Sequence, residues 1–359
     1  AESLAEGPSE NQGAADVLSA RVWDPSNKDG RFLALAKAKL GDEEERVDVR
    51  QLQMLSFYCF TPVADPTATR DRIFSLLTDL DPQIAEAKKD PAGEPRAEHD
   101  RPFLAKDAFR GTVYVAEEGI NGQLAVPVGK VEELRQRLLQ VPELAPEGRL
   151  SLNIGDVVDA ETSTFRRFLV RRRKQILTDH LEGDDALNLA DAGEELKAAE
   201  WHEAMRAEDA IVLDCRNDYE SSVGKFKPAV PLDTRTFGDT WAALEARLPE
   251  KAREQPDTPV YIYCTGGIRC VKVGAYMKQK LGLKNVKRLE HGIIGYERWA
   301  EAEDVDSTFE GENFFFDRRA VVDPTSESKA EKRERAPGRD DTADHDVEKR
   351  SRIDEADPQ

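Results

Sequence analysis

A short segment around residue 264 combines a cysteine, two glycines and an arginine at a spacing that could build a reactive thiol. The segment reads YIYCTGGIRC, in which Cys264 follows a strand-like run and Arg269 comes shortly after it. We expect the glycines to let the loop curl, so that backbone N–H groups and the next helix N-terminus point at the sulfur. These groups and the Arg269 charge favour a thiolate, which predicts a lowered pKa and a nucleophilic Cys264. The expected active-site loop comprises Thr265, Gly266, Gly267 and Ile268.

The alternative for a cysteine at a strand end is a buried core residue without a chemical role. Here the glycine pair, Arg269 and the strand–loop–helix context favour the reactive cysteine. Cysteine phosphatases also place an arginine behind such a loop, but with one residue more than the four that separate Cys264 from Arg269. The shorter loop suits a sulfur-sized occupant better than a tetrahedral phosphate.

A second group of charged residues follows another expected strand, AIVLDCR. Its members Asp214, Arg216 and Glu220 match the pattern D-x-R…E that accompanies such loops in rhodaneses. We expect the three side chains to support the Cys264 loop through ion pairs, and direct participation in the chemistry is the alternative.

The chain has four cysteines, Cys59, Cys215, Cys264 and Cys270, and no CxxC pair. This usage argues against a disulfide scaffold and against a structural zinc site, so no metal is expected. Cys215 is expected to be a core residue. Cys270 could resolve a persulfide or a sulfenic acid on Cys264, or it could be a small buried helix residue.

Strands and helices follow each other in two different ways along the chain, which indicates two domains. Residues 51–180 have the order strand, helix, strand, strand, helix, strand, which predicts a ferredoxin-like (acylphosphatase-like) α+β domain. In residues 188–318 strands alternate with helices, which predicts an α/β domain with a parallel sheet. Residues 1–50 are expected to form a partly disordered extension and residues 319–359 a disordered charged tail.

Two segments of the first domain carry further expectations. GTVYVAEEGINGQLAVPV predicts two strands around a turn that contains Gly119, Asn121 and Gly122. FRRFLVRRRKQIL leads out of the domain as a charged strand or helix. Its basic side chains could bind RNA phosphates, and a solvated polar face is the alternative. The candidates are Arg166, Arg167, Arg171, Arg172, Arg173 and Lys174.

The net charge of −19 argues against non-specific nucleic-acid binding by the whole surface, but it leaves room for a local basic groove. No apolar run is long enough for a transmembrane helix, and the first residues do not resemble a secretory signal. We therefore expect no membrane association. A cytoplasmic location is expected, with an organelle after transit-peptide removal as the alternative.

The motifs together resemble the rhodanese-containing tRNA uridine hydroxylase family over about residues 51–318. The matching stretches are FYCFTPV, GTVYVAEEGINGQLAV, DCRN…E, YCTGGIRC, LEHGI and FFFDRR. The resemblance implies oxygen-dependent conversion of the wobble uridine of tRNA to 5-hydroxyuridine, with Cys264 essential and no metal or flavin. Two departures are Val271, where the family usually has glutamate, and a polar tail in place of the cysteine-rich C-terminal extension of many bacterial members.

Two other functions remain open from the residues alone. A rhodanese-type sulfurtransferase would load Cys264 as a persulfide from thiosulfate or another donor. A persulfide carrier or binding module would dock on a larger assembly through the charged tail and would need no catalysis. The hydroxylase should need both oxygen and tRNA, and the sequence leaves its protein partners unknown.

Overall fold

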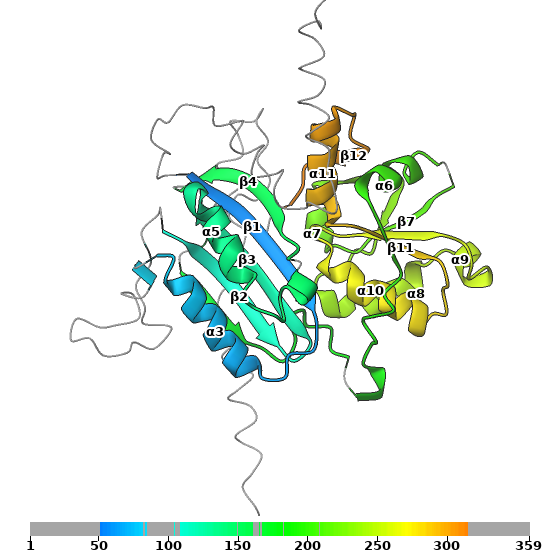
Figure 1. Ribbon diagram of the computed structural model, residues 1–359. Coiled ribbons are helices and arrows are strands. Elements are labelled where there is room, and N and C mark those ends of the chain that lie inside the picture. The colour runs from blue at the N-terminus through cyan, green and yellow to red at the C-terminus, as the bar shows by residue number, and fades with distance from the viewer. Residues whose placement is uncertain are drawn as a thin grey trace, which may run out of the picture. The chain divides into compact units, whose positions relative to one another are not determined.

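The computed structural model contains two five-stranded β-sheets that follow one another along the chain (Figure 1). The expected N-terminal extension and the expected charged tail lie outside the described residues. None of the described helices is both long and apolar enough to cross a membrane. The structure describes residues 51–81, 83–84, 104, 108–148, 150–160, 165, 167–181, 183–207 and 209–314.

The first sheet has the strand order β4-β1-β3-β2-β5. Its first four strands are antiparallel to their neighbours, and β5 is added at the edge, parallel to β2. This arrangement confirms the ferredoxin-like α+β fold expected from the element order. The elements are β1 (Gln51–Phe60), α3 (Pro66–Thr78), β2 (Arg110–Ala116), β3 (Gly119–Pro127), α5 (Val131–Leu138), β4 (Asn153–Asp159) and β5 (Phe168–Arg172).

Both helices of the first sheet pack on one of its faces (Figure 1). Helix α3 begins at Asp65, whose carboxylate accepts the backbone N–H groups of Thr67 and Ala68, and Pro66 occupies its first turn. Ile73 of α3 and Leu134 of α5 are completely buried in the main core of this half. Alternation along each strand therefore separates this core from a smaller apolar cluster on the opposite face.

The expected turn at Gly119, Asn121 and Gly122 is wrong, because all three residues lie inside β3. The chain reverses at Glu117 and Glu118 instead. The glycines are required by close packing: a Cβ at Gly119 would lie 2.1 Å from the Cys59 carbonyl oxygen, and a Cβ at Gly122 would lie 2.3 Å from the Phe57 ring. Glycine in a strand can mark such a close approach as readily as a turn.

The second sheet has the order β6-β11-β10-β7-β9, and every neighbouring pair is parallel. This confirms the expected parallel α/β sheet. Two short strands, β8 and β12, form a separate antiparallel pair. The strands are β6 (Glu194–Leu196), β7 (Ile211–Asp214), β8 (Gly224–Phe226), β9 (Ala229–Pro231), β10 (Val260–Tyr263), β11 (Val286–Leu289) and β12 (Phe309–Gly311). The helices are α6 (Ala198–Ala204), α7 (Asp218–Ser221), α8 (Thr240–Arg247), α9 (Glu250–Glu254), α10 (Ile268–Gln279) and α11 (Gly292–Glu303).

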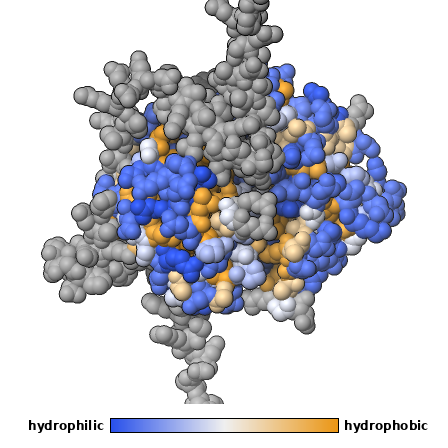
Figure 2. All heavy atoms as spheres, viewed as in Figure 1, coloured by the Kyte–Doolittle hydropathy of each residue, from blue (hydrophilic) through white to orange (hydrophobic). Residues whose placement is uncertain are grey.

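Helices cover both faces of the second sheet, because its strands are apolar on both sides. Along β10, Val260 and Ile262 belong to a core shared with α8, α9 and α10, whereas Tyr263 belongs to a core shared with α6 and α11. Trp201 of α6 is completely buried in the second of these cores. On the face drawn in Figure 2, hydrophilic residues gather over α9, where only Ala252 is buried.

We predict that Gly119→Ala lowers the free energy of unfolding by about 2–4 kcal/mol, since the residue has φ +150° and no room for a methyl group. Gly129→Ala is the matched control, because a Cβ there meets nothing within 4 Å. It should change stability by less than about 1 kcal/mol. Urea unfolding of both variants measures the difference. Equal stability of the two would contradict the close approach between β3 and β1.

Candidate active site

Cys264 directly follows β10, the central strand of the parallel sheet, and α10 begins at Ile268. The thiol therefore lies at the carboxyl ends of the strands, where open α/β sheets bind ligands. The loop residues Thr265, Gly266 and Gly267 connect strand and helix, as the segment YIYCTGGIRC predicts. Ile268 belongs to the first turn of α10 rather than to the loop itself.

Backbone groups close the loop tightly around Cys264. Gly267 has a positive φ of 96°, and its N–H donates a hydrogen bond to the Cys264 sulfur at 3.1 Å. From the other side, the N–H of Ile293 donates to the Cys264 carbonyl oxygen and that of Ile294 to the Thr265 carbonyl oxygen, both at 3.1 Å. The start of α11 is thus part of the site, a contribution that hydrophobic periodicity did not predict.

A buried ion pair between Glu220 and Arg269 holds the loop from inside. Arg269 donates through both terminal nitrogens to the two Glu220 oxygens, at 2.5 and 2.8 Å. The Thr265 hydroxyl donates to Glu220 at 3.0 Å and accepts from Arg269 at 3.1 Å. Burial by itself would raise the pKa of Glu220, but the Arg269 charge and hydrogen bonds hold it below its ordinary value. Of the expected supporting residues, Glu220 is the one that contacts the loop directly.

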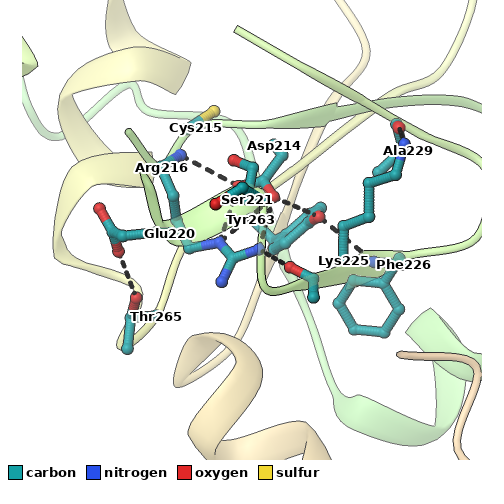
Figure 3. A network of polar contacts seen from close by, with 12 residues as sticks. Asp214, Cys215, Arg216, Glu220, Ser221, Lys225, Phe226, Ala229, Tyr263 and Thr265 are labelled. Atoms are coloured by element: carbon teal, nitrogen blue, oxygen red, sulfur yellow. Dashed lines mark hydrogen bonds and ion pairs between the residues drawn. The ribbon is translucent and has the colours of Figure 1, made fainter. Parts of the chain in front are cut away.

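Asp214 and Arg216 form a second, completely buried pair beneath the loop (Figure 3). The Arg216 side chain donates to both Asp214 oxygens, with a shortest distance of 2.7 Å. Tyr263, the residue before Cys264, donates its hydroxyl hydrogen to Asp214 at 2.7 Å. Arg216 also donates to the carbonyl oxygen of Gly224. This pair therefore fixes the ends of β7, β8 and β10, and it supports the loop through Tyr263.

The expectation of a lowered Cys264 pKa is wrong for this arrangement. Burial raises the pKa of the Cys264 thiol well above its ordinary value, and the hydrogen bond with the Cys270 thiol raises it further. The Arg269 charge acts in the opposite direction but is weaker, because Glu220 neutralises it. Cys264 has no exposed surface, so in this state it is a thiol and not a thiolate.

Two residues of the first sheet reach the loop, and sequence reasoning did not identify either role. The Asn153 side chain of β4 donates to the Gly266 carbonyl oxygen at 3.0 Å. Tyr58 of β1 lies over Gly267, where a Cβ would come within 2.7 Å of its hydroxyl oxygen. A polar Asn153 at the start of the apolar run NIGDVV was the available signal, but its partner lies more than a hundred residues away.

The residues after Cys270 lie at the same boundary. Val271 packs with Ala192 and Ala275 in an apolar cluster. Lys272 is buried, and its ammonium group contacts carboxylate oxygens of Glu118 and Asp179 at 2.7 Å each. Two carboxylates therefore compensate one buried cation.

The basic run surrounds the end of β5, the edge strand of the first sheet: Arg171 and Arg172 lie within the strand, and Arg173 and Lys174 follow it. Arg171 is half-buried, and Arg173 stacks over the Tyr114 ring at 5.1 Å. Arg172 and Lys174 are exposed, Arg167 is half-buried, and Arg166 lies outside the described residues. Within the part of the chain that the structure describes, no group of three or more His, Cys, Asp or Glu side chains could hold a metal ion.

We predict that Glu220→Gln destabilises the protein by about 3–5 kcal/mol at neutral pH, because it leaves the buried Arg269 without a counter-charge. The Glu220 pKa lies below its ordinary value of 4.5, so the pair stabilises fully above that pH and is lost as the pH falls through the lower value. The difference between wild type and variant in denaturant unfolding should therefore shrink in acid. Asp218→Asn on the same short helix is the control and should cost less than about 1 kcal/mol. If the difference in free energy of unfolding between wild type and Glu220→Gln did not change with pH, the Glu220–Arg269 ion pair would not be its cause.

Each half of the fold matches a known protein-family model. Residues 95–176 match the UPF0176 acylphosphatase-like domain, and residues 197–302 match the rhodanese-like domain. A tRNA uridine(34) hydroxylase of Salmonella newport is 35% identical over 287 residues, which cover 79% of this chain and 69% of that protein. One from Escherichia coli O127:H6 is 34% identical over 289 residues, covering 80% and 69%.

Among solved structures, the rhodanese-like domain of an Anabaena protein is 14% identical, with a TM-score of 0.26, and the match covers 33% of this chain and 79% of that domain. This likeness is too weak to add to the assignment. The matched lengths of 287 and 289 residues are long enough to extend over both sheets. The chain belongs to the tRNA uridine(34) hydroxylase family.

Proposed function

We propose that this protein hydroxylates the wobble uridine of tRNA to 5-hydroxyuridine, with molecular oxygen as co-substrate and Cys264 as the nucleophile. The observation that carries the proposal is the 35% identity to a tRNA uridine(34) hydroxylase over both halves of the fold. The relatives' names do not favour the sulfurtransferase and carrier alternatives. The acidic composition supports a cytoplasmic location for the same activity.

The chemistry assigned to Cys264 is transient covalent activation of the base. The sulfur adds to C6 of uracil, which makes C5 electron-rich and open to oxidation. One atom of dioxygen enters at C5 and the other leaves as water, and a two-electron reductant supplies the balance. Loss of the C5 proton and departure of the Cys264 sulfur then restore the ring. Neither a metal nor a flavin is part of this proposal.

The loop residues would act at two points of this cycle. The Gly267 N–H, 3.1 Å from the sulfur, is placed to stabilise the thiolate that forms before addition and after elimination. Arg269 adds positive charge at the same point once its balance with Glu220 is changed by an anionic substrate. Because Cys264 is completely buried, the uracil ring reaches it only after side chains over the loop move.

We expect tRNA from a hydroxylation-deficient host to gain 5-hydroxyuridine when this protein is expressed, and to lack it with Cys264→Ser. Nucleoside mass spectrometry measures the gain of one oxygen atom on uridine. Cys59→Ser is the matched control, since this half-buried cysteine lies on β1 and outside the loop, and it should keep the activity. No modified uridine with folded wild-type protein, together with release of sulfite from thiosulfate, would favour the sulfurtransferase instead.

The basic run in and after β5 is proposed to bind tRNA phosphates. Replacing the exposed Arg172 and Lys174 with glutamine should weaken tRNA binding and lower the slope of log affinity against log salt by about 1–2. Lys227→Gln, an exposed lysine of the second half, is the control and should leave the slope unchanged. Fluorescence anisotropy at several salt concentrations measures both. If the slope of log affinity against log salt did not change in the double variant, the basic run would be a solvated face that does not bind tRNA.

A further inference from the structure

Three of the four cysteines converge beneath the active-site loop. Cys264 and Cys270 have no exposed surface, and Cys215 is 1% exposed. All three belong to the same apolar core and are free thiols. The fourth, Cys59, lies on β1 in the first half of the chain. The proposed hydroxylation uses one thiol of this cluster and gives no role to Cys215.

The pairing of β7 with β10 and the position of Cys270 at the start of α10 bring the three cysteines to one place. β7 and β10 are parallel neighbours in which Asp214 pairs with Tyr263, so Cys215 and Cys264 follow at adjacent strand ends. The Cys215 N–H donates to the Tyr263 carbonyl oxygen at 2.9 Å, which continues the ladder to the cysteine. Both side chains point to the face covered by α10, where Cys270 occupies the first turn.

Cys270 is the middle member of the cluster. It shares the buried core with Cys215 and Cys264, and the thiols of both residues affect the pKa of the Cys270 thiol. Thiols that lie in one core at adjacent element ends can exchange a disulfide once side-chain rotation brings their sulfur atoms together.

We propose that Cys264, Cys270 and Cys215 form a thiol relay that returns an oxidised Cys264 to its thiol. A hydroperoxide oxidises Cys264 to a sulfenic acid: its O–O bond breaks, and the corresponding alcohol or water leaves. The Cys270 sulfur attacks the sulfenic sulfur, forms the Cys264–Cys270 disulfide and releases water. The Cys215 thiol then attacks the Cys270 sulfur, its proton passes to Cys264, and the Cys215–Cys270 disulfide remains. An external dithiol reduces that disulfide and is itself oxidised.

The relay would protect Cys264 from irreversible oxidation. A cysteine that works with dioxygen meets its reduced by-products, and a sulfenic acid without a neighbouring thiol proceeds to sulfinic acid, which is irreversible here. Moving the disulfide to Cys215 frees Cys264 for another cycle before any reductant arrives. The relay rests on the proposed reactivity of Cys264 but needs no tRNA, so its test is independent of hydroxylation.

The chain offers an unambiguous way to map the disulfides, because trypsin places each thiol in a separate peptide. Cleavage at arginine and lysine gives residues 207–216 with Cys215, residues 254–269 with Cys264 and residues 270–272 with Cys270. The full chain is treated with hydrogen peroxide without RNA, alkylated in denaturant with N-ethylmaleimide, digested and examined by mass spectrometry. We expect peptide 207–216 linked to peptide 270–272, with Cys264 alkylated.

Single variants test the order of the steps. Cys215→Ala should trap the Cys264–Cys270 disulfide, and Cys270→Ala should leave a sulfenic acid on Cys264 that dimedone labels, followed by several-fold more sulfinic acid than in wild type. Cys59→Ser should give the wild-type map. Sulfinic acid on Cys264 of the wild type without any disulfide, or a direct Cys264–Cys215 disulfide that persists in Cys270→Ala, would overturn the relay. The wild-type map decides even if a variant fails to fold.

Discussion

The Glu220–Arg269 ion pair is the interaction on which the geometry of the site depends. Both groups are buried, so neither could remain charged without the other, and their two hydrogen bonds fix the distance between α7 and α10. Thr265 is bound between them, which gives the loop its path from β10 to the helix. The backbone N–H of Asn217 donates to Glu220 as part of a capping box, so the carboxylate is held in place from its own helix.

The same pair explains why the resting thiol is not activated. A guanidinium shared with a carboxylate has little net field at the sulfur, so burial dominates and the pKa of Cys264 is raised. Activation therefore requires a change that opens the loop to solvent or draws Glu220 away from Arg269. In the proposed reaction, an anionic phosphate of the RNA substrate would compete for the Arg269 guanidinium, and its arrival would then activate the nucleophile.

Sequence patterns predicted those parts of the fold that depend on local periodicity. The alternating run PVYIYC and the glycines after it were sufficient to place Cys264 at a strand end before a helix. They were insufficient to predict the pKa of Cys264, because the electric field of Arg269 at the sulfur depends on Glu220, the ion-pair partner of Arg269 from a distant helix. Asn153 and the true position of the turn before Gly119 were missed for the same reason, since long-range contacts leave no period in the sequence.

The replacement of the family's glutamate by Val271 does not alter the charges that the loop depends on. The Val271 side chain lies against Ala192 and Ala275, where it buries its methyl groups. The adjacent Lys272 does not need that carboxylate, because Glu118 and Asp179 already compensate it. Glu220, Arg269 and the Gly267 N–H belong to other parts of the site, so the substitution changes packing at the boundary of the two halves and leaves the surroundings of the Cys264 sulfur intact.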